Sequence, residues 1–372
     1  MINEKRLVYQ FIQLLETDSP SKREAPVRDL LKEYFGSRGL EVIEDRAGEK
    51  IGGDAGNLLI RIAGTVPGPP ILFAAHMDTV EPGIGVKTLI DAEGRISSQG
   101  DTILGGDDKA GIGAMLEAYE VIKEQNIPHP PLEFLFTVCE EHGLLGVKNF
   151  DLGTLKAPMG YVLDAGGRPG AIVIRSPAIN VFEYIARGKT AHAGISPEKG
   201  INAIQAAGMA LAKMPNGRID KETTCSIGLI NGGTARNIVP DYCLITGEAR
   251  SFSLSGLQDI TANLVNTFQR EVEKYGAQAE VKAELLYPEI RLDTNCVAVE
   301  TAVKAIESIG LNPELISTGG GSDASIINSA IPCVNLGVGM EQVHTCDEYI
   351  TISSLVQVTK IILAIIRQSK NL

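Results

Sequence analysis

Histidine and aspartate follow an apolar stretch of this sequence at a spacing that suits metal chemistry. Residues 71–75 are all apolar, and His76 and Asp78 come directly after them, one residue apart. An imidazole is a common metal ligand, and a neighbouring carboxylate often orients it. Taken alone, the pair is equally well explained as polar residues at the exit of a buried strand. The residues at the ends of the other predicted strands decide between the two explanations.

Other candidate ligands stand next to predicted strands or at the start of a predicted helix. They are Glu140 and Glu141 after strand 132–139, Asp164 after strand 160–163, Asp107 before helix 110–123, and His344 beyond strand 332–338. The carboxyl ends of adjacent strands in an α/β sheet converge in space. We therefore expect these side chains to meet His76 at one edge of a sheet.

The candidate metal ligands are two imidazoles and three carboxylates: His76, Asp107, Glu141, Asp164 and His344. One catalytic zinc takes three protein ligands and a water, so this set is too large for a single ion. If Asp107 bridges two ions, each ion receives three protein bonds, as a two-metal hydrolase requires. Asp78 is then expected to orient His76. Glu140, which is beside a ligand but is not itself one, is expected to act as general base on the bridging water.

Several other motifs have simpler explanations. Residues 188–190 (G-K-T) lack the upstream glycine of a phosphate loop, because Glu183 stands in its place. Residues 320–324 (G-G-S-D-A) lack the last glycine of a nucleophile elbow. We interpret Cys139 as a core thiol and His142 as a solvated loop residue, and we assign no role to His129.

Composition limits the class of protein. The chain has 372 residues, with 46 acidic against 34 basic residues and a net charge of −12, which disfavours a nucleic-acid or anionic-membrane partner. No run of about 18 apolar residues could span a bilayer, and residues 1–16 lack the pattern of a secretory signal. The six cysteines are scattered without a C-x-x-C pair. We therefore expect a cytoplasmic protein with reduced thiols.

Hydrophobic patterning divides the chain into two domains. Residues 1–177 and 290–372 carry α/β patterning, including helices over 4–16, 23–38, 296–309, 323–329 and 351–368, and a loop or hairpin over 81–100. Residues 178–289 differ and predict the order β-α-β-β-α-β, which is the ferredoxin-like arrangement. Its predicted elements are strands 180–187, 223–231, 241–249 and 279–286 and helices 200–213 and 255–275.

The sequence resembles the zinc-dependent exopeptidases and deacylases that include tripeptidase T, carboxypeptidase G and succinyl-diaminopimelate desuccinylase, and most closely the tripeptidase T-like branch. Seven motifs in family order, spread over most of the chain, carry the resemblance. They are A-H-M-D-T (75–79), G-G-D-D-K-A-G (105–111), C-E-E-H-G (139–143), L-D-A-G-G (163–167), A-H-A-G (191–194), G-G-T-A-R-N-I-V-P (232–240) and V-H-T (343–345).

The resemblance implies an α/β/α catalytic domain on a mixed sheet, with residues 178–289 as an inserted lid and dimerisation domain. It implies two zinc ions per subunit, for which Co²⁺ or Mn²⁺ could substitute. Asp107 would bridge them, with Glu141 and His344 on one ion and His76 and Asp164 on the other. It also implies a cis peptide after Asp107.

The resemblance further implies roles in substrate binding. In a homodimer, His192 would reach the active site of the partner subunit and stabilise the oxyanion. Asn237 and Arg250 would hold the carboxylate of a short peptide substrate. We also expect Gly320, in the glycine-rich loop 319–322, to contact the substrate.

Asp164 favours release of an N-terminal residue, because related carboxypeptidases and deacylases tend to carry glutamate at this position. The chain departs from tripeptidase T in being shorter and in reading A-H-A-G where that branch often has H-P-G. The alternatives are a deacylase of N-acyl amino acids or a carboxypeptidase on the same scaffold. A third alternative is a non-catalytic binding protein on an inherited hydrolase fold. In such a protein we would expect metal-ligand positions to be replaced by other residue types, and here they are intact.

Overall fold

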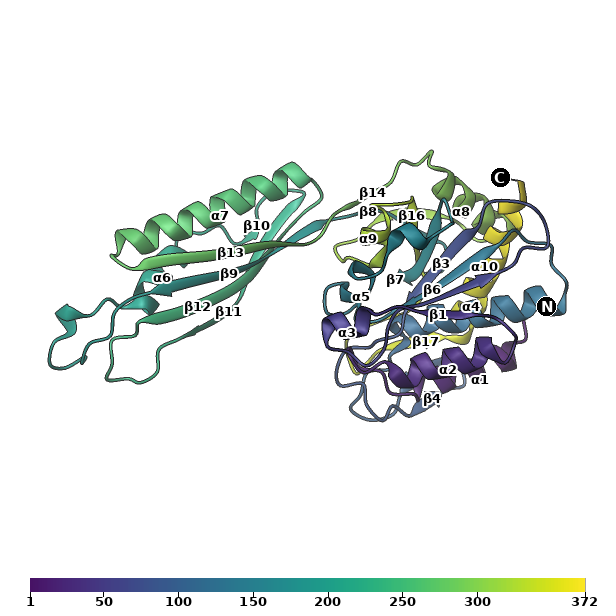
Figure 1. Ribbon diagram of the computed structural model, residues 1–372, viewed down its shortest axis with the longest axis horizontal. Helices are drawn as coiled ribbons and strands as arrows, with labels where there is room; N and C mark the ends of the chain where they lie inside the picture. The colour runs from purple at the N-terminus through teal and green to yellow at the C-terminus, as the bar shows by residue number, and fades with distance from the viewer. Residues whose placement is uncertain (372) are drawn as a thin grey trace. The chain divides into compact units, whose positions relative to one another are not determined.

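The computed structural model describes residues 1–371, which form two compact units. Unit 1 comprises residues 1–175 together with the chain from 290 onward, and unit 2 comprises residues 176–289 (Figure 1). No helix among the described residues is long and apolar enough to cross a membrane.

Unit 1 is built on a mixed sheet of nine strands in the order β1-β2-β6-β3-β7-β16-β8-β14, with β15 paired to β8. Strands β6, β3, β7 and β16 run parallel to one another and form its centre. Their carboxyl ends therefore lie along one edge. The strands are β1 (Val42–Glu44), β2 (Leu58–Ile62), β3 (Ile71–His76), β6 (Leu132–Thr137), β7 (Gly160–Ala165), β8 (Ala171–Ser176), β14 (Ile290–Arg291), β15 (Glu314–Ser317) and β16 (Cys333–Gly337).

The central strands are apolar because both of their faces are covered. Every residue of β3 and β6 is buried, and this explains their unbroken apolar runs. Ile71, Phe73 and Ala75 point into the larger hydrophobic cluster, while the alternating residues Leu72 and Ala74 are buried on the other side of the sheet. A separate sheet joins β4 (Thr88–Ile90), β5 (Arg95–Ser98) and β17 (Tyr349–Thr351) in the order β17-β5-β4.

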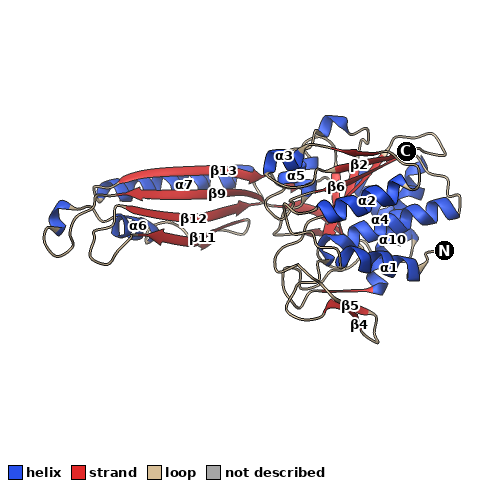
Figure 2. Cartoon of the chain, turned by 60° about the horizontal axis from the view of Figure 1, so that its bottom comes forward, coloured by secondary structure: helices blue, strands red, loops and turns tan. Residues whose placement is uncertain are grey.

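Helices cover both faces of the large sheet. One layer holds α1 (Glu4–Leu15), α2 (Ala25–Gly36), α4 (Gly106–Glu124), α8 (Val297–Ser308) and α10 (Ile352–Gln368), whose apolar residues share the main cluster. Figure 2 shows α1, α2, α4 and α10 side by side in this layer. The short helices are α3 (Ala47–Ile51), α5 (Leu145–Lys148) and α9 (Asp323–Ile327), and α9 packs against β7 and β16. This α/β/α architecture confirms the predicted fold class.

Unit 2 is a five-stranded antiparallel sheet in the order β10-β11-β12-β9-β13, with both helices on one face (Figure 1). Its four long strands, numbered along the chain, lie in the spatial order 4-1-3-2, so the predicted ferredoxin-like arrangement is confirmed. The elements are β9 (Ala178–Arg187), α6 (Ala203–Leu211), β10 (Gly217–Arg218), β11 (Thr223–Gly232), β12 (Tyr242–Ser251), α7 (Leu254–Lys274) and β13 (Gln278–Tyr287).

The structure also corrects several predicted elements. Strands β8 and β15 and the short helices α3 and α5 were not predicted, whereas the hairpin within 81–100 is present as β4 and β5. The helix predicted over 200–213 begins only at Ala203, because the Asn202 side chain accepts a hydrogen bond from the Gln205 N–H and caps it. The helix predicted over 323–329 ends at Ile327.

Candidate metal centre and active site

The carboxyl edge of the central strands carries the predicted ligands. His76 ends β3, Asp164 lies in β7, Glu141 follows β6 by a short turn, and His344 lies in the loop after β16. Asp107 lies in the irregular first turn of α4, where the peptide bond to Asp108 is cis, as the resemblance implies. A cavity of about 350 Å³ opens here and is lined by four of these ligands, Glu140 and Gly320.

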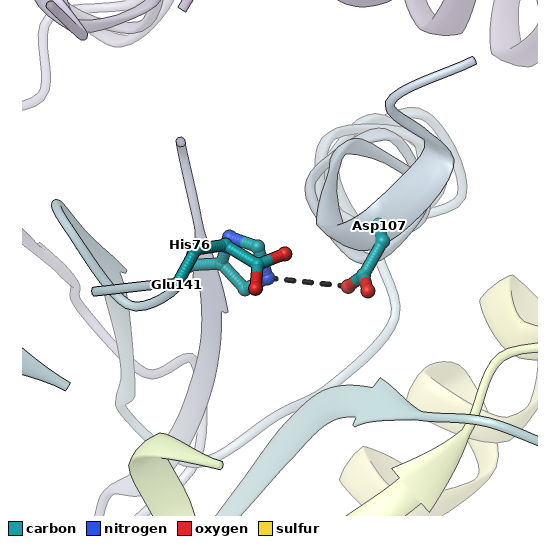
Figure 3. A group of neighbouring side chains, drawn as sticks. All are labelled: His76, Asp107 and Glu141. Carbon is teal, nitrogen blue, oxygen red and sulfur yellow. Dashed lines mark hydrogen bonds and ion pairs between the residues drawn. The ribbon is translucent and has the colours of Figure 1, made fainter. Parts of the chain in front are cut away.

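Asp107 lies between two imidazoles. Its Oδ1 is 3.2 Å from Nε2 of His76, and its Oδ2 is 3.4 Å from Nε2 of His344. The same nitrogen of His344 is 2.8 Å from Oε1 of Glu141, and Nε2 of His76 is 3.8 Å from Oδ1 of Asp164. Figure 3 shows His76 and Glu141 directed toward the Asp107 carboxylate. The structure thus brings the other four predicted ligands together around Asp107.

The site is rich in buried acid. Burial, and then the charge of Asp164, raises the pKa of Glu140 well above its ordinary value. Burial likewise raises the pKa of Asp164, with the charge of Asp107 adding to the effect. Burial also acts to raise the pKa of Asp107, but hydrogen bonds to His344 and His76 outweigh it and hold this pKa well below its usual range. Hydrogen bonds to Asp107 and Glu141 raise the pKa of His344 to about 10.

These residues fit a pair of divalent cations. Ligand atoms around a tetrahedral zinc, with bonds of about 2.1 Å, lie about 3.4 Å apart. The distances of 2.8–3.8 Å between the imidazole nitrogens and carboxylate oxygens are close to that spacing. A concentration of buried carboxylates is costly unless cations neutralise it. A set of imidazole and carboxylate donors suits zinc, and the same donors can also bind cobalt or manganese.

Asp78 contacts more than the imidazole that it was predicted to orient. Nδ1 of His76 is 2.9 Å from the backbone oxygen of Asp78 and 3.4 Å from its carboxylate. The carboxylate accepts backbone N–H bonds from Glu140 at 2.9 Å and Glu141 at 3.2 Å, and a hydroxyl bond from Ser21 at 2.6 Å. Asp78 therefore holds both the imidazole and the turn that carries the two glutamates.

Four more buried side chains hold the ligand segments, and the sequence reasoning gave none of them this role. Each accepts a hydrogen bond from a backbone N–H, either of a predicted ligand or, for Cys139, of the residue before the predicted base Glu140. The bonds are His76 N–H to Asp108 Oδ2 (3.3 Å), Asp107 N–H to Glu348 Oε1 (3.1 Å), Asp164 N–H to Asn335 Oδ1 (3.2 Å) and Cys139 N–H to Glu24 Oε1 (3.0 Å).

Asp108 could also be counted as a metal ligand, since one of its oxygens lies near His76 and Asp164. Its Oδ2 accepts from the His76 N–H, however, and its Oδ1 accepts from the Gly111 N–H at 3.2 Å. Both oxygens are therefore engaged with backbone, which favours Asp107 over Asp108 as the predicted ligand. Of the four side chains, only Asp108 adjoins a predicted ligand in sequence.

Known proteins of similar sequence and structure identify the family to which this chain belongs. The model of peptidase family M20/M25/M40 matches residues 72–368. The chain belongs to this family. It is 44% identical to the aminopeptidase PepT of Bacillus cereus ATCC 10987, covering 99% of each chain with a TM-score of 0.91. It is 40% identical to a tripeptidase of Staphylococcus aureus Mu50, covering 100% of each chain with a TM-score of 0.95.

A third relative is the uncharacterized protein YqjE of Bacillus subtilis strain 168. It is 44% identical over 99% of this chain and 100% of its own length. The expected kinship with the tripeptidase T-like branch is confirmed by the aminopeptidase and tripeptidase structures. This member of the M20/M25/M40 peptidases is therefore a metallopeptidase, a hydrolase of peptide bonds.

The remaining predicted residues of this peptidase lie in unit 2. His192 and Asn237 are exposed neighbours, because Ala193 N–H donates to the Asn237 backbone oxygen at 3.0 Å and His192 bridges to Ile238. Nδ1 of His192 accepts from Gly194 N–H at 3.2 Å. Arg250 lies near the far end of β12, where its Nε is 2.7 Å from Oε1 of Glu248.

Cys139 has the surroundings of a core thiol in this peptidase. It is fully buried, and burial followed by the charges of Asp78 and Glu24 raises its thiol pKa to about 12. Its sulfur is 3.9 Å from Nδ1 of His142, which is exposed. Neither residue lines the cavity at the metal centre.

Proposed function

We propose that this metallopeptidase removes the N-terminal residue from short peptides at a two-metal centre. The observation that carries the proposal is Asp107, whose two oxygens face the imidazoles of His76 and His344 at 3.2 and 3.4 Å. A bridging carboxylate presents its oxygens in this way. The aminopeptidase and the tripeptidase at 44% and 40% identity support the reaction class.

Glu141 and His344 would hold one zinc ion, His76 and Asp164 the other, and Asp107 both. Two such ions supply Lewis acidity, which polarises the scissile carbonyl and makes a water molecule easier to deprotonate. Co²⁺ or Mn²⁺ could occupy the same donors.

Glu140 is the proposed general base. Glu140 lines the cavity together with Asp107 and Asp164, and the residue is 9% exposed. The Asp78 carboxylate holds its backbone N–H at 2.9 Å, so the side chain starts from a fixed position. Glu140 would take a proton from the attacking water and return it to the leaving amine.

Asn237 and Arg250 are proposed to bind the substrate carboxylate, and the geometry of unit 2 supports contributions from two subunits. The loop with Asn237 precedes Tyr242 at the start of β12, and Arg250 is near the other end. Eight strand residues span about 26 Å. An extended tripeptide spans about 10 Å, so both side chains of one chain could not reach the same peptide. One of them, with His192, would come from a partner subunit.

The exposed edge of unit 2 offers a surface for that partner. Strand β10 pairs with β11 only at Thr224 and Cys225, so the rest of that edge has no strand partner among the described residues. Leu229 and Ile230 on this edge are 64% and 51% exposed, and Ile204 and Met209 of α6 are 40% and 41% exposed. Exposed apolar residues beside an unpaired edge suit association of two copies.

Two adjacent glutamates provide the decisive test of the mechanism. Glu140→Gln should keep two bound zinc ions while turnover of tripeptides falls by about 10³-fold or more, because only the proton acceptor is lost. Glu141→Gln should lose an ion together with activity. Wild-type turnover by Glu140→Gln, or full turnover by metal-free protein, would refute the mechanism.

The substrate class is tested with a matched panel of free tripeptides, the same tripeptides N-acetylated, and N-acetyl or N-succinyl amino acids. Release of the N-terminal residue from free tripeptides alone is expected. Preference for the acylated amino acids would identify a deacylase, and release of the C-terminal residue would identify a carboxypeptidase.

The contribution of the partner subunit is tested by mixing chains. His192→Ala and Glu140→Gln chains are each expected to be nearly inactive. Heterodimers of the two should recover part of the activity, because one site would combine an intact Glu140 with the partner's intact histidine. No recovery in verified heterodimers would contradict the trans role. Leu229→Lys should weaken dimerisation, as measured by sedimentation.

A further inference from the structure

We propose that Glu348 is a positioning residue that fixes Asp107 relative to the loop bearing His344. This inference rests on the proposed two-metal centre and adds a residue outside its ligand set. Glu348 is 1% exposed and both of its oxygens are engaged. Oε2 accepts from Gly105 N–H at 2.8 Å, and Oε1 accepts from Asp107 N–H at 3.1 Å.

The two glycines before Asp107 make this contact feasible. Gly105 has φ = +74°, a conformation that side chains rarely adopt. A Cβ added to Gly106 would lie 3.2 Å from Oε1 of Glu348. The G-G-D motif therefore provides a turn at its first position and room for the Glu348 carboxylate at its second.

Glu348 belongs to the same loop as His344. The loop is closed at its base by two hydrogen bonds between the backbones of Glu341 and Tyr349, at 2.9 and 3.1 Å. Glu348 lies inside that base, and its own N–H donates to the Thr345 oxygen at 3.1 Å. One side chain thus connects the base of the His344 loop to the backbone of Asp107.

This connection helps to set the spacing at the metal centre. Nε2 of His344 lies 3.4 Å from Oδ2 of Asp107, although the two residues come from different elements. Hydrogen bonds from backbone N–H groups to a carboxylate are shorter and stronger than those between neutral groups. If Glu348 relaxes, the ion shared by Asp107, Glu141 and His344 loses its geometry. The other ion would also bind Asp107, but it keeps His76 and Asp164, two ligands that Glu348 does not contact, so it should be affected less.

A carboxylate is needed because two N–H donors converge on it. Glutamine at position 348 would have only one side-chain oxygen that can accept a hydrogen bond. Its amide NH₂ group, which is a donor, would then face the second backbone N–H, which is also a donor. If Glu348 only stabilised the fold, its replacement would lower the free energy of unfolding and would not change the affinity of one ion relative to the other. A positioning residue should instead weaken one of the two ions selectively.

Glu133 provides a matched control. It is also 1% exposed, and its Oε2 accepts two backbone N–H bonds, from Lys156 and Ala157, each at 2.9 Å, while its Oε1 accepts from Nε of Arg61 at 3.0 Å. The segment that it holds carries no predicted ligand. Glu348→Gln and Glu133→Gln therefore each neutralise a buried carboxylate that holds two backbone N–H groups, and Glu133→Gln also removes the ion pair with Arg61, away from the metal centre.

The experiment measures zinc stoichiometry and affinity by equilibrium competition with a chromogenic chelator, together with urea unfolding of the metal-free proteins. Glu348→Gln should weaken one of the two ions by about 10- to 100-fold and lower kcat with little change in KM. Glu133→Gln should bind both ions like the wild type, even if urea unfolds it earlier. Gly106→Ala, which displaces the Glu348 carboxylate without removing it, should shift the same ion in the same direction.

Two results would overturn the positioning role. One is wild-type affinity for both ions in Glu348→Gln and Gly106→Ala. The other is an equal loss of both ions in Glu348→Gln and Glu133→Gln. Failure of the underlying two-metal proposal would be visible separately, because wild-type protein would then bind fewer than two ions or Glu141→Gln would retain both.

Discussion

Glu24 makes a specific prediction about how stability depends on pH. It is fully buried, and burial followed by the charge of Asp78 raises its pKa from 4.5 to about 7. Its Oε1 accepts both the Lys22 N–H at 2.8 Å and the Cys139 N–H at 3.0 Å. Its Oε2 has no hydrogen-bond partner among the described residues. Glutamine can therefore replace the protonated form, with its oxygen in place of Oε1.

The sign of the effect follows from the raised pKa. The folded protein binds the Glu24 proton more tightly than the unfolded chain, so this contribution to stability is full below about pH 4.5 and is lost as the pH rises through about 7. A rise from about pH 5 to pH 8 should cost the wild type about 2 kcal/mol of unfolding free energy relative to Glu24→Gln.

The assay is urea unfolding of the metal-free wild type and Glu24→Gln across that pH range. Buried acids that do not interact with Glu24 are common to both proteins and cancel in the difference, whereas the coupling between Glu24 and Asp78 is part of the effect measured. Glu24→Ala is the control, because it leaves two N–H groups without an acceptor and should be less stable at every pH, by about 1–3 kcal/mol. A difference between wild type and Glu24→Gln that does not change with pH would refute the reasoning.

Three other predictions concern stability. Glu117→Ala should lower the unfolding free energy by about 2–3 kcal/mol in urea, because the fully buried Glu117 pairs with Arg6 at 2.7 Å; no loss would contradict this. Gly146→Ala should cost about 2–3 kcal/mol, since its Cβ would lie 1.9 Å from the Val138 oxygen. Gly208→Ala, with nothing within 4 Å of the added Cβ, should be neutral or stabilising; equal effects at the two glycines would refute the packing argument. Chelation should lower the thermal midpoint, and two equivalents of Zn²⁺ should restore it, since saturation to 100 times Kd adds about 2.7 kcal/mol per site; an unchanged midpoint would count against the site.

The candidate site residues at the ends of strands were predictable because the pattern that identifies them lies within a few neighbouring residues of the sequence. A buried apolar run followed at once by His76 or Glu140 needs no distant information, and the parallel order of the strands then brings the ends together. Strand β15 was missed because it is only four residues long and three of them are polar or exposed. Its pairing with Ala171 and its neighbours depends on a segment far away in the chain.

The side chains that hold the ligand backbones could not be found in this way. Glu348 is 241 residues from the N–H of Asp107, and Glu24 is 115 residues from that of Cys139. Asp78 has one role of each kind. Its place two residues after His76 is visible in the sequence, whereas the hydrogen bond that it accepts from Glu140 N–H joins residues 62 positions apart. Carboxylates that accept backbone N–H bonds leave no spacing pattern, because any residue can supply the donor.

The chain enters and leaves unit 2 through neighbouring strands. Ile179 of β9 pairs with Tyr287 of β13, and on the unit 1 side the Leu292 N–H donates to the Ile174 oxygen at 2.9 Å. Residues paired in this way are about 5 Å apart, so a link of a few residues could close unit 1 without the insert. Insertion, loss or exchange of unit 2 would therefore need only one pair of neighbouring junctions, and the five predicted ligands, all of which lie in unit 1, would stay together.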